Sequence, residues 1–286
     1  MTLPTMTPDQ IKVLRKCAEQ HKFDHGSALI LSGPAYRTGA ARLAAMAALR
    51  VGAGVVTLGA PQEALPECAA QLTGIMLREV SEALDLSLIL AEDARINALC
   101  LGPGFGVEPA QSAILRAVLA AKRATVLDAD ALTLMAQDRD LFPQLHETCV
   151  LTPHAGEFKR LFPGLGEDGT PFTLEEKKDA TQRAADLSGA VVLYKGMQTT
   201  IATPGCPDVA VMDSRSVPAA AYLATAGAGD VLSGLITGVL ARGGTPAQSA
   251  EIGALLHVMA ARNIGPGLIA EDLPQQIPNI YRELGV

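Results

Sequence analysis

The run Ala98-Leu99-Cys100-Leu101-Gly102-Pro103-Gly104-Phe105-Gly106 shows a pattern of residues that recurs along this chain. A short apolar stretch ends in a glycine-rich turn, which predicts a buried strand that stops at residue 101. Residues 109–121 are expected to form a helix. A strand, a glycine turn and a helix in this order indicate a layered α/β fold.

The same order recurs on both sides of this run. We expect strands at 28–31, 55–58, 125–128, 149–152 and 190–195, and helices at 39–51, 230–241 and 247–261. Residues 199–202 and 209–212 are expected to form a hairpin around Pro204-Gly205-Cys206-Pro207. The sequence therefore predicts a three-layer α/β/α sandwich with a central, mostly parallel sheet.

No linker divides the chain, so we expect one domain over residues 1–286. Residues 1–25 are expected to form an N-terminal helical arm, with Thr7 as N-cap, Pro8 at the first helical position and a helix through Ala18. Tryptophan is absent and aromatic residues make up 3% of the chain, so small aliphatic residues must fill the core.

Composition limits the possible partners and compartment. The chain has 286 residues, 49% of them hydrophobic, and a net charge of −7. Without a long basic run, nucleic acid is not an expected partner. Without an apolar run of about 20 residues, no membrane span is expected. The five cysteines are widely spaced and odd in number, which predicts reduced thiols, mostly buried, in a cytoplasmic protein.

The turn Thr225-Ala226-Gly227-Ala228-Gly229-Asp230 indicates chemistry. Unpaired N–H groups and the positive dipole end of the following helix form an anion site. Asp230 at its mouth could accept a proton from a hydroxyl group beside a phosphate. The turn therefore favours phosphoryl transfer, although a glycine turn with an acidic cap is the simpler alternative.

Other polar residues gather where strands are expected to end. In open α/β sheets, ligands bind beyond the carboxyl ends of the strands. That edge is expected to collect the following residues: Gly33, Gly102, Gly104, Asp128, Asp130, His154, Lys195 and Gly196. Their convergence predicts a ligand site there more strongly than any single motif does.

Read together, these segments resemble the NAD(P)H-hydrate dehydratase family, carbohydrate-kinase-like proteins of the ribokinase fold. The matching segments are His21–Gly26, Tyr36–Ala41 (similar to YTGAA), Leu49–Thr57 (LRxGAGLVT), Leu101–Gly106 (IGPGLG), Val126–Leu132 (VLDADAL), Leu151–Phe158 (LTPHPGEF) and Ala224–Asp230 (ATAGSGD). The resemblance implies dehydration of the hydrates of NADH and NADPH to restore the cofactor. The reaction would be coupled to ADP or ATP through phosphorylation of the ring hydroxyl and loss of phosphate.

The resemblance also implies roles for individual residues. The expected catalytic residues are Gly227, Ala228, Gly229 and Asp230; the substrate-binding residues Ala40, Gly104, His154 and Asp230; the nucleotide-binding residues Lys195, Gly196, Met197, Gln198, Thr199 and Gly229. Asp128 and Glu157 are the candidate ligands of Mg²⁺, with Asp130 nearby. Capping is the alternative for all three acids, and a structural role is the alternative for His154.

Several features depart from the family pattern or leave choices open. Ala228 replaces the usual serine, and Met197-Gln198 alters the usual KGAGT segment, which puts the choice of nucleotide in doubt. The stretch before the first strand is too short for the epimerase domain of some members. The resemblance also implies a homo-oligomer, with a tetramer as one expected assembly. The alternatives are a ribokinase-fold kinase for a hydroxylated vitamin precursor or sugar, and a catalytically decayed nucleotide-binding relative.

Overall fold

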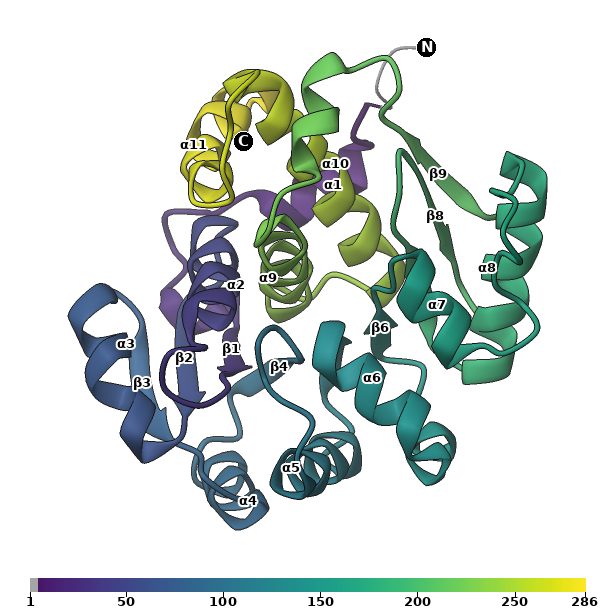
Figure 1. Cartoon of the computed structure of the whole chain (residues 1–286). Helices are drawn as coiled ribbons and strands as arrows, with labels where there is room; N and C mark the ends of the chain where they lie inside the picture. Colours follow the sequence, from purple (N-terminus) through teal and green to yellow (C-terminus); the bar gives the residue numbers. More distant parts are fainter. Residues whose placement is uncertain (1–4) are drawn as a thin grey trace.

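The computed structural model describes residues 5–286, which form a single nine-stranded sheet in the order β3-β2-β1-β4-β5-β6-β7-β8-β9 (Figure 1). The strands are β1 (Ser27–Leu31), β2 (Val55–Ala60), β3 (Met76–Glu79), β4 (Ile96–Leu101), β5 (Ala124–Leu127), β6 (Cys149–Leu151), β7 (Val191–Tyr194), β8 (Gln198–Ala202) and β9 (Ala210–Asp213). Neighbouring strands from β3 to β7 pair in parallel, whereas β8 and β9 pair antiparallel. The mostly parallel sheet and the hairpin are confirmed.

Helices cover both faces of this sheet. They are α1 (Pro8–Leu14), α2 (Gly39–Arg50), α3 (Leu65–Gln71), α4 (Ala83–Glu92), α5 (Pro109–Ala120), α6 (Ala129–Gln137), α7 (Ala155–Leu161), α8 (Leu174–Ser188), α9 (Ala228–Ala241), α10 (Pro246–Ile264) and α11 (Asp272–Leu284). One core cluster joins the sheet to α2, α9, α10 and α11, and a second joins it to α4 through α8. The three-layer α/β/α architecture is therefore confirmed.

The strands show why the sheet has two cores. In β1, Ala28 and Ile30 point into the first cluster, while Leu29 and Leu31 point into the second. Successive side chains of a strand alternate between faces, so a strand buried on both faces must be apolar throughout. All five residues of β1 are buried, as the uninterrupted apolar run predicted.

Several elements differ from the sequence-based expectation, which did not name the helices α3, α4, α6, α7, α8 and α11. The first helix ends at Leu14 and not at Ala18, because the Arg242 side chain takes up backbone carbonyls at its end, with Nε 2.9 Å from Val13 O and Nη2 2.9 Å from Arg15 O. Strand β3 was not predicted. Its residues are largely exposed at the edge of the sheet, so it lacks the apolar pattern of a buried strand.

The N-terminal arm is described from residue 5 onward, and its first four residues lie outside the described part of the chain. All five cysteines are free thiols, of which Cys68, Cys100 and Cys149 are buried, as expected. None of the helices within residues 5–286 combines the length and apolar character needed to cross a membrane.

Candidate functional site

The turn before α9 takes the shape that its glycines predicted. Gly227 has a φ of 90°, a left-handed conformation that favours glycine, and it directly precedes the helix. The N–H of Ala228 makes a long hydrogen bond to Thr225 O (3.4 Å). Within residues 5–286, the N–H groups of Gly229 and Asp230 have no hydrogen-bond acceptor. Two donors at the positive end of a helix are therefore available to an anion.

Lys195 connects this turn to the ends of three other strands. Its Nζ lies 2.8 Å from Asp128 Oδ1 and 3.7 Å from Glu157 Oε2. A Cβ added at Gly229 would lie 3.6 Å from the same Nζ and 3.9 Å from Asp128 Oδ2. Residues that follow β5, β6 and β7 thus meet the start of α9 at the carboxyl edge of the sheet.

The electrostatics of this cluster change the pKa of two groups. Burial, and after it the negative charge of Asp128, raise the pKa of Asp230 to about 7, against the opposing charge of Lys195. Burial alone would lower the pKa of Lys195, but the charges of Asp128 and Glu157 outweigh burial and raise it. Lys195 thus stays charged, while Asp230 is poised to exchange a proton near neutral pH.

The loops that follow β1 and β4 pack against each other. A Cβ added at Gly104, whose φ is 61°, would lie 3.2 Å from Ala40 Cβ and 2.7 Å from Arg37 O. One added at Gly33 would lie 2.0 Å from Gly104 O. The strand order reverses between β1 and β4, which is where open α/β sheets bind ligands. The structure therefore brings Ala40 and Gly104 together at the expected place.

His154 caps helix α7, which is the kind of structural role expected as the alternative to substrate binding. It is the N-cap of α7, and its Nδ1 accepts a hydrogen bond from Gly156 N (3.0 Å). Its Nε2 lies 3.4 Å from Glu157 Oε1. The side chain remains 56% exposed, so capping leaves the ring open to a ligand. Substrate contact by His154 stays a prediction.

The candidate metal ligands are already engaged by protein donors. Asp128 Oδ1 accepts from Ala129 N (2.9 Å) as well as from Lys195, and Glu157 Oε2 accepts from His154 N (2.8 Å). Asp130 Oδ2 accepts from Gly106 N (2.7 Å). In the described chain, no group of three His, Cys, Asp or Glu side chains is arranged to hold a metal ion. The lone pairs that remain on these carboxylates can accept hydrogen bonds from the water shell of a hydrated Mg²⁺, so the residues fit contact through water. Metal binding by Asp128 and Glu157 stays a prediction.

The predicted nucleotide-binding segment runs from the end of β7 into β8. Thr199 Oγ1 donates to Gly196 O (2.9 Å), which closes the turn. Gln198 Nε2 donates to Asp213 Oδ2 (3.1 Å), so this side chain is held against β9. Met197 is 44% exposed. The two residues that depart from the family pattern thus lie on the hairpin, and Lys195 alone reaches the carboxylate cluster.

Sequence reasoning missed two side chains beside the cluster. Ser233 Oγ donates to Asp128 Oδ2 (2.6 Å) and also contacts Gly229 O (3.1 Å). Arg37 Nη2 lies 3.4 Å from Asp130 Oδ2. Ser233 could have been found from its spacing, because it lies one helical turn after Gly229. Nothing in the sequence connects Arg37 to a carboxylate 93 residues away.

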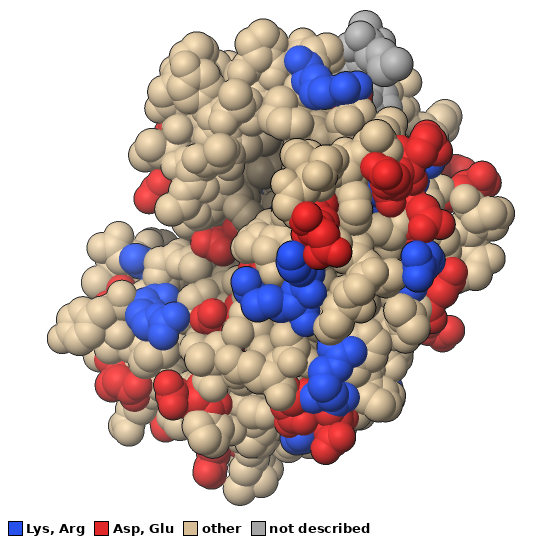
Figure 2. All heavy atoms as spheres, turned by 45° about the vertical axis from the view of Figure 1, so that its right-hand side comes forward, with Lys and Arg blue, Asp and Glu red and all other residues tan. Residues whose placement is uncertain are grey.

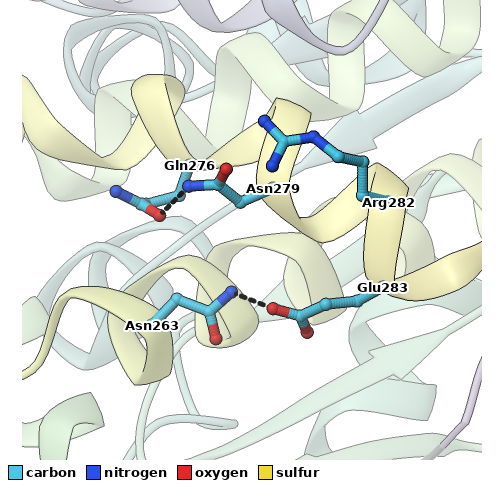
Figure 3. A pocket seen from close by; sticks show the side chains of 5 residues that line it. All are labelled: Asn263, Gln276, Asn279, Arg282 and Glu283. Carbon is cyan, nitrogen blue, oxygen red and sulfur yellow. Dashed lines mark hydrogen bonds between the residues drawn. The ribbon is translucent and has the colours of Figure 1, made fainter.

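The surface of the molecule has charged side chains of both signs and a second hollow away from the sheet edge. On the face in Figure 2, which is hollowed in its upper half, basic and acidic side chains lie close to one another. A separate hollow of about 590 Å³ between α10 and α11 is lined by Asn263, Gln276, Asn279, Arg282 and Glu283 (Figure 3). It contains none of the predicted site residues. The carboxyl edge of the sheet therefore remains the candidate site.

The three-layer α/β/α arrangement, with a glycine turn before α9 at the carboxyl edge of the sheet, is a fold shared with ribokinase-like proteins. The structure matches a ribokinase-like superfamily protein of Enterococcus faecalis with a TM-score of 0.77 and 21% identity, over 98% of this chain and 95% of that one. A family model described as NAD(P)H-hydrate dehydratase matches residues 28–281. The chain belongs to this family.

Named relatives agree with the family assignment. The chain is 35% identical to a bifunctional NAD(P)H-hydrate repair enzyme of Moorella thermoacetica over 94% of its length, and 36% identical to one of Salinibacter ruber over 93%. It spans about half the length of these relatives, 52% and 50%. The ADP/ATP-dependent NAD(P)H-hydrate dehydratase of Bacillus subtilis, crystallised with ATP and Mg²⁺, matches at 26% identity and a TM-score of 0.79 over 99% of both chains.

Proposed function

We propose that this chain dehydrates the hydrates of NADH and NADPH and couples the reaction to ADP or ATP. A phosphoryl group passes from the nucleotide to the ring hydroxyl. The ring nitrogen's electron pair then expels phosphate, which carries the hydroxyl oxygen away and leaves an iminium ion. Loss of a proton from the neighbouring ring carbon to solvent re-forms the ring double bond. Hydroxide is a poor leaving group and phosphate is a good one, so the nucleotide drives the dehydration.

The position of Asp230 is the observation that carries this proposal. Its carboxyl group stands at the start of α9, beside the free N–H groups of Gly229 and Asp230 itself. With its pKa raised to about 7, Asp230 can accept the hydroxyl proton when the phosphoryl group arrives. The two N–H groups then stabilise negative charge on that phosphoryl group.

The remaining predicted residues supply binding. The close approach of Ala40 and Gly104 offers backbone to the hydrate, and the exposed ring of His154 offers a donor. Residues 195–199 and Gly229 would hold the nucleotide. Mg²⁺ would enter with the nucleotide, neutralise part of its charge, and face Asp128 and Glu157 through water.

The test is to mix the purified chain with NADH hydrate, Mg²⁺ and either ADP or ATP, and to follow the near-ultraviolet absorbance of the dihydronicotinamide ring. We expect a rise that depends on the nucleotide and equals the phosphate released. The nucleotide that produces the rise in absorbance is the phosphoryl donor. A folded protein that binds nucleotide but produces no rise with either one would overturn the proposal.

The nature of the product separates this proposal from a kinase. The structure also matches a hydroxyethylthiazole kinase of Pyrococcus horikoshii, at a TM-score of 0.63 and 15% identity, which is a likeness of fold alone. A kinase would release a stable phosphorylated compound, whereas the dehydratase releases phosphate and restored cofactor. A decayed relative would bind nucleotide and release neither product.

We also propose that the protein is cytoplasmic and forms a homo-oligomer, with a tetramer as one expected assembly. Leu84 and Leu88, one turn apart on α4, are 60% and 53% exposed, which supports an interface on that helix. Sedimentation velocity would give the assembly state, and a monomer at micromolar concentration would contradict this proposal.

A further inference from the structure

The ammonium group of Lys177 lies against the predicted nucleotide-binding segment. Lys177 is on α8, and its Nζ donates to Lys195 O (3.1 Å). The same Nζ lies 4.1 Å from the centroid of the Tyr194 ring. A Cβ added at Gly196 would lie only 2.8 Å from it, so glycine at this position keeps the space beside the ammonium open. Lys177 is therefore in contact with the Tyr194 ring and the Lys195 carbonyl, next to Gly196.

This ammonium is partly buried without a counter-ion. Among the residues that the structure describes, no carboxylate lies within 4.0 Å of Lys177 Nζ. Glu167 is the one acid whose charge acts on it, and its Oε1 accepts from Phe172 N (3.3 Å) and Tyr194 OH (3.5 Å). Burial lowers the pKa of Lys177 to about 8, and Glu167 opposes that shift in part. A desolvated cation of this kind gains stability when an anion binds beside it.

The two neighbouring lysines are already paired. Lys195 is held between Asp128 and Glu157 (2.8 and 3.7 Å), and Lys178 pairs with Glu175 at the surface (3.1 Å). Lys195 is thus largely neutralised by the protein itself. An incoming polyphosphate needs another cation. Among residues 5–286, Lys177 is the lysine in contact with this segment that lacks an acidic partner.

We propose that Lys177 is a nucleotide-binding residue whose ammonium group pairs with a phosphate of the adenine nucleotide. This inference rests on the proposed function for the identity of the anion. The competing explanation is purely structural: Lys177 would only fix the Lys195 carbonyl and the Tyr194 ring. The two differ because pairing with phosphate changes the charge state of Lys177 on binding, whereas a structural role does not.

The first test measures ATP binding directly by calorimetry, with Mg²⁺ and without hydrate. The variant is Lys177→Met, and the matched control is Lys178→Met, the next residue of the same helix. Loss of a charge-assisted contact should weaken binding about 10- to 100-fold in the first variant. The control should stay within about twofold, as expected of a surface pair. Equal affinity in wild type and Lys177→Met would overturn the proposal.

The second test follows protons in the wild-type protein. At pH 8 about half of the Lys177 side chains are neutral, and pairing with phosphate raises their pKa, so ATP binding should take up as much as about half a proton. The ionisable groups that face Lys177 are Glu167 and Tyr194. Burial raises the pKa of Tyr194 to about 12, so Tyr194 does not titrate at this pH. Proton uptake appears as a binding heat that changes with the ionisation enthalpy of the buffer.

The variants separate the two proposals. Lys177→Arg keeps the charge and should retain affinity within a few-fold, and it replaces Lys177→Met if that variant does not fold. Asp230, whose pKa is about 7, also takes up protons when a phosphate binds beside it, so the readout is the difference between the two proteins. Proton uptake in Lys177→Met equal to that of the wild type would overturn the role of Lys177. If the chain binds ATP through Lys177 but yields a stable phosphorylated product, the dehydratase proposal fails and the inference about Lys177 stands. If hydrate is repaired equally with and without Lys177 at ATP concentrations below the wild-type KM, only the inference fails.

Discussion

Asp230 shows how one side chain acquires reactivity from its surroundings. An exposed aspartate has a pKa near 3.9. Burial at the carboxyl edge of the sheet, together with the negative charge of Asp128, raises the pKa of Asp230 to about 7. Lys195 limits the rise. Raised pKa values of this kind are typical of functional sites, because the same desolvation makes the charged form reactive.

Replacement of Asp230 by Asn should abolish turnover while leaving nucleotide binding intact. The amide keeps the size of the side chain but cannot accept a proton, so turnover should fall about 10²- to 10⁴-fold. The Kd for ATP, measured by calorimetry, should change less than about threefold. Turnover within tenfold of wild type would show that Asp230 is not the base.

Activity and stability should respond in opposite directions to pH around Asp230. If Asp230 is the base, kcat/KM rises as pH increases through about 7. The folded-state pKa lies above the unfolded value, so the folded protein binds this proton more tightly. Stability from this group is therefore full below about pH 4 and is lost as pH rises through about 7.

The corresponding measurement is the melting temperature of wild type and Asp230→Asn from pH 5 to 8.5. Asparagine does not titrate, so the melting temperature of the variant should rise relative to wild type as pH increases. A difference that is constant over this range would contradict the raised pKa.

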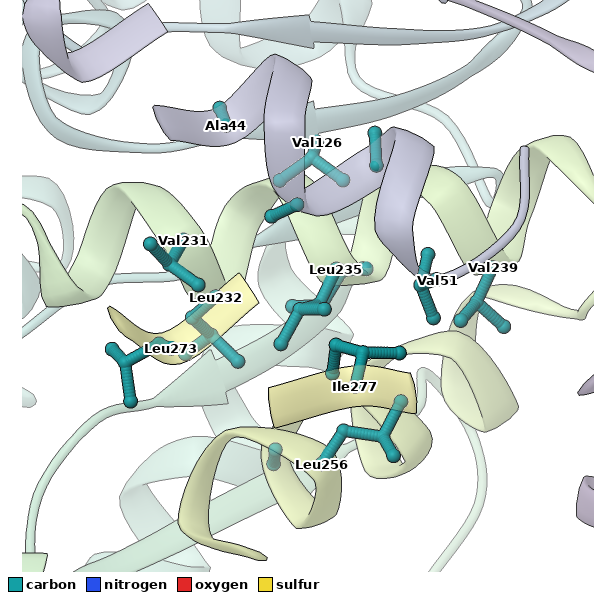
Figure 4. Close-up of a cluster of buried hydrophobic side chains, with 14 of the residues drawn as sticks. Ala44, Val51, Val126, Val231, Leu232, Leu235, Val239, Leu256, Leu273 and Ile277 are labelled. Atoms are coloured by element: carbon teal, nitrogen blue, oxygen red, sulfur yellow. The ribbon is translucent and has the colours of Figure 1, made fainter. Parts of the chain in front are cut away.

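At the scale of elements, the packing of α9 on α2 depends on two glycines. A Cβ at Gly234 would lie 2.1 Å from Ala44 O, and one at Gly238 would lie 2.6 Å from Ala48 O. Figure 4 shows the apolar side chains of α9, among them Val231 and Leu235, between α2 and the C-terminal helices. The contact therefore brings the two helix backbones close together. This explains how a chain poor in aromatic residues fills its core.

Substitution of Gly234 by Val should destabilise the protein strongly. The added side chain meets backbone, which cannot move aside without separating α2 from α9. The cost should be about 3 kcal/mol or more in the free energy of unfolding, measured in urea. Gly74→Ala is the matched control, since a Cβ there would meet only Leu49 Cδ2 at 3.5 Å, and it should cost about 0.5 kcal/mol or less.

At the scale of the whole molecule, the candidate site is assembled from distant parts of the chain. Ala40 follows β1, Gly104 follows β4, Asp128 follows β5, Lys195 follows β7 and Asp230 lies in the first turn of α9. Parallel strands share one carboxyl edge, so every loop at that edge contributes to the same place. A ligand bound there contacts several elements at once.

Nucleotide binding should therefore stabilise the entire fold. At a nucleotide concentration about 100 times the Kd, linkage adds about 2.7 kcal/mol. For a protein of this size, that corresponds to a rise in melting temperature of roughly 4–5 °C. Thermal unfolding with and without ATP and Mg²⁺ measures it, with guanosine as a control that lacks phosphate. No shift under saturating ATP would exclude a nucleotide site in the folded state.

The sequence by itself was sufficient for the local structure and for the class of fold. Apolar runs such as 28–31 and 98–101 and the glycine turns that follow them predicted the strands, since these properties depend on neighbouring residues. Turn chemistry likewise identified Gly227, because only its left-handed backbone lets α9 begin where it does. The edge strand β3 was not predicted, because an exposed strand needs no apolar pattern.

Contacts between distant residues were decided only by the tertiary structure. The pairing of Lys195 with Asp128 and Glu157, the contact of Ser233 with Asp128, and the unpaired ammonium of Lys177 all depend on which loops the sheet brings together. The raised pKa of Asp230 has the same origin. Burial and Coulomb interactions act through space, so local sequence carries the kinds of side chain present but not the partners they meet.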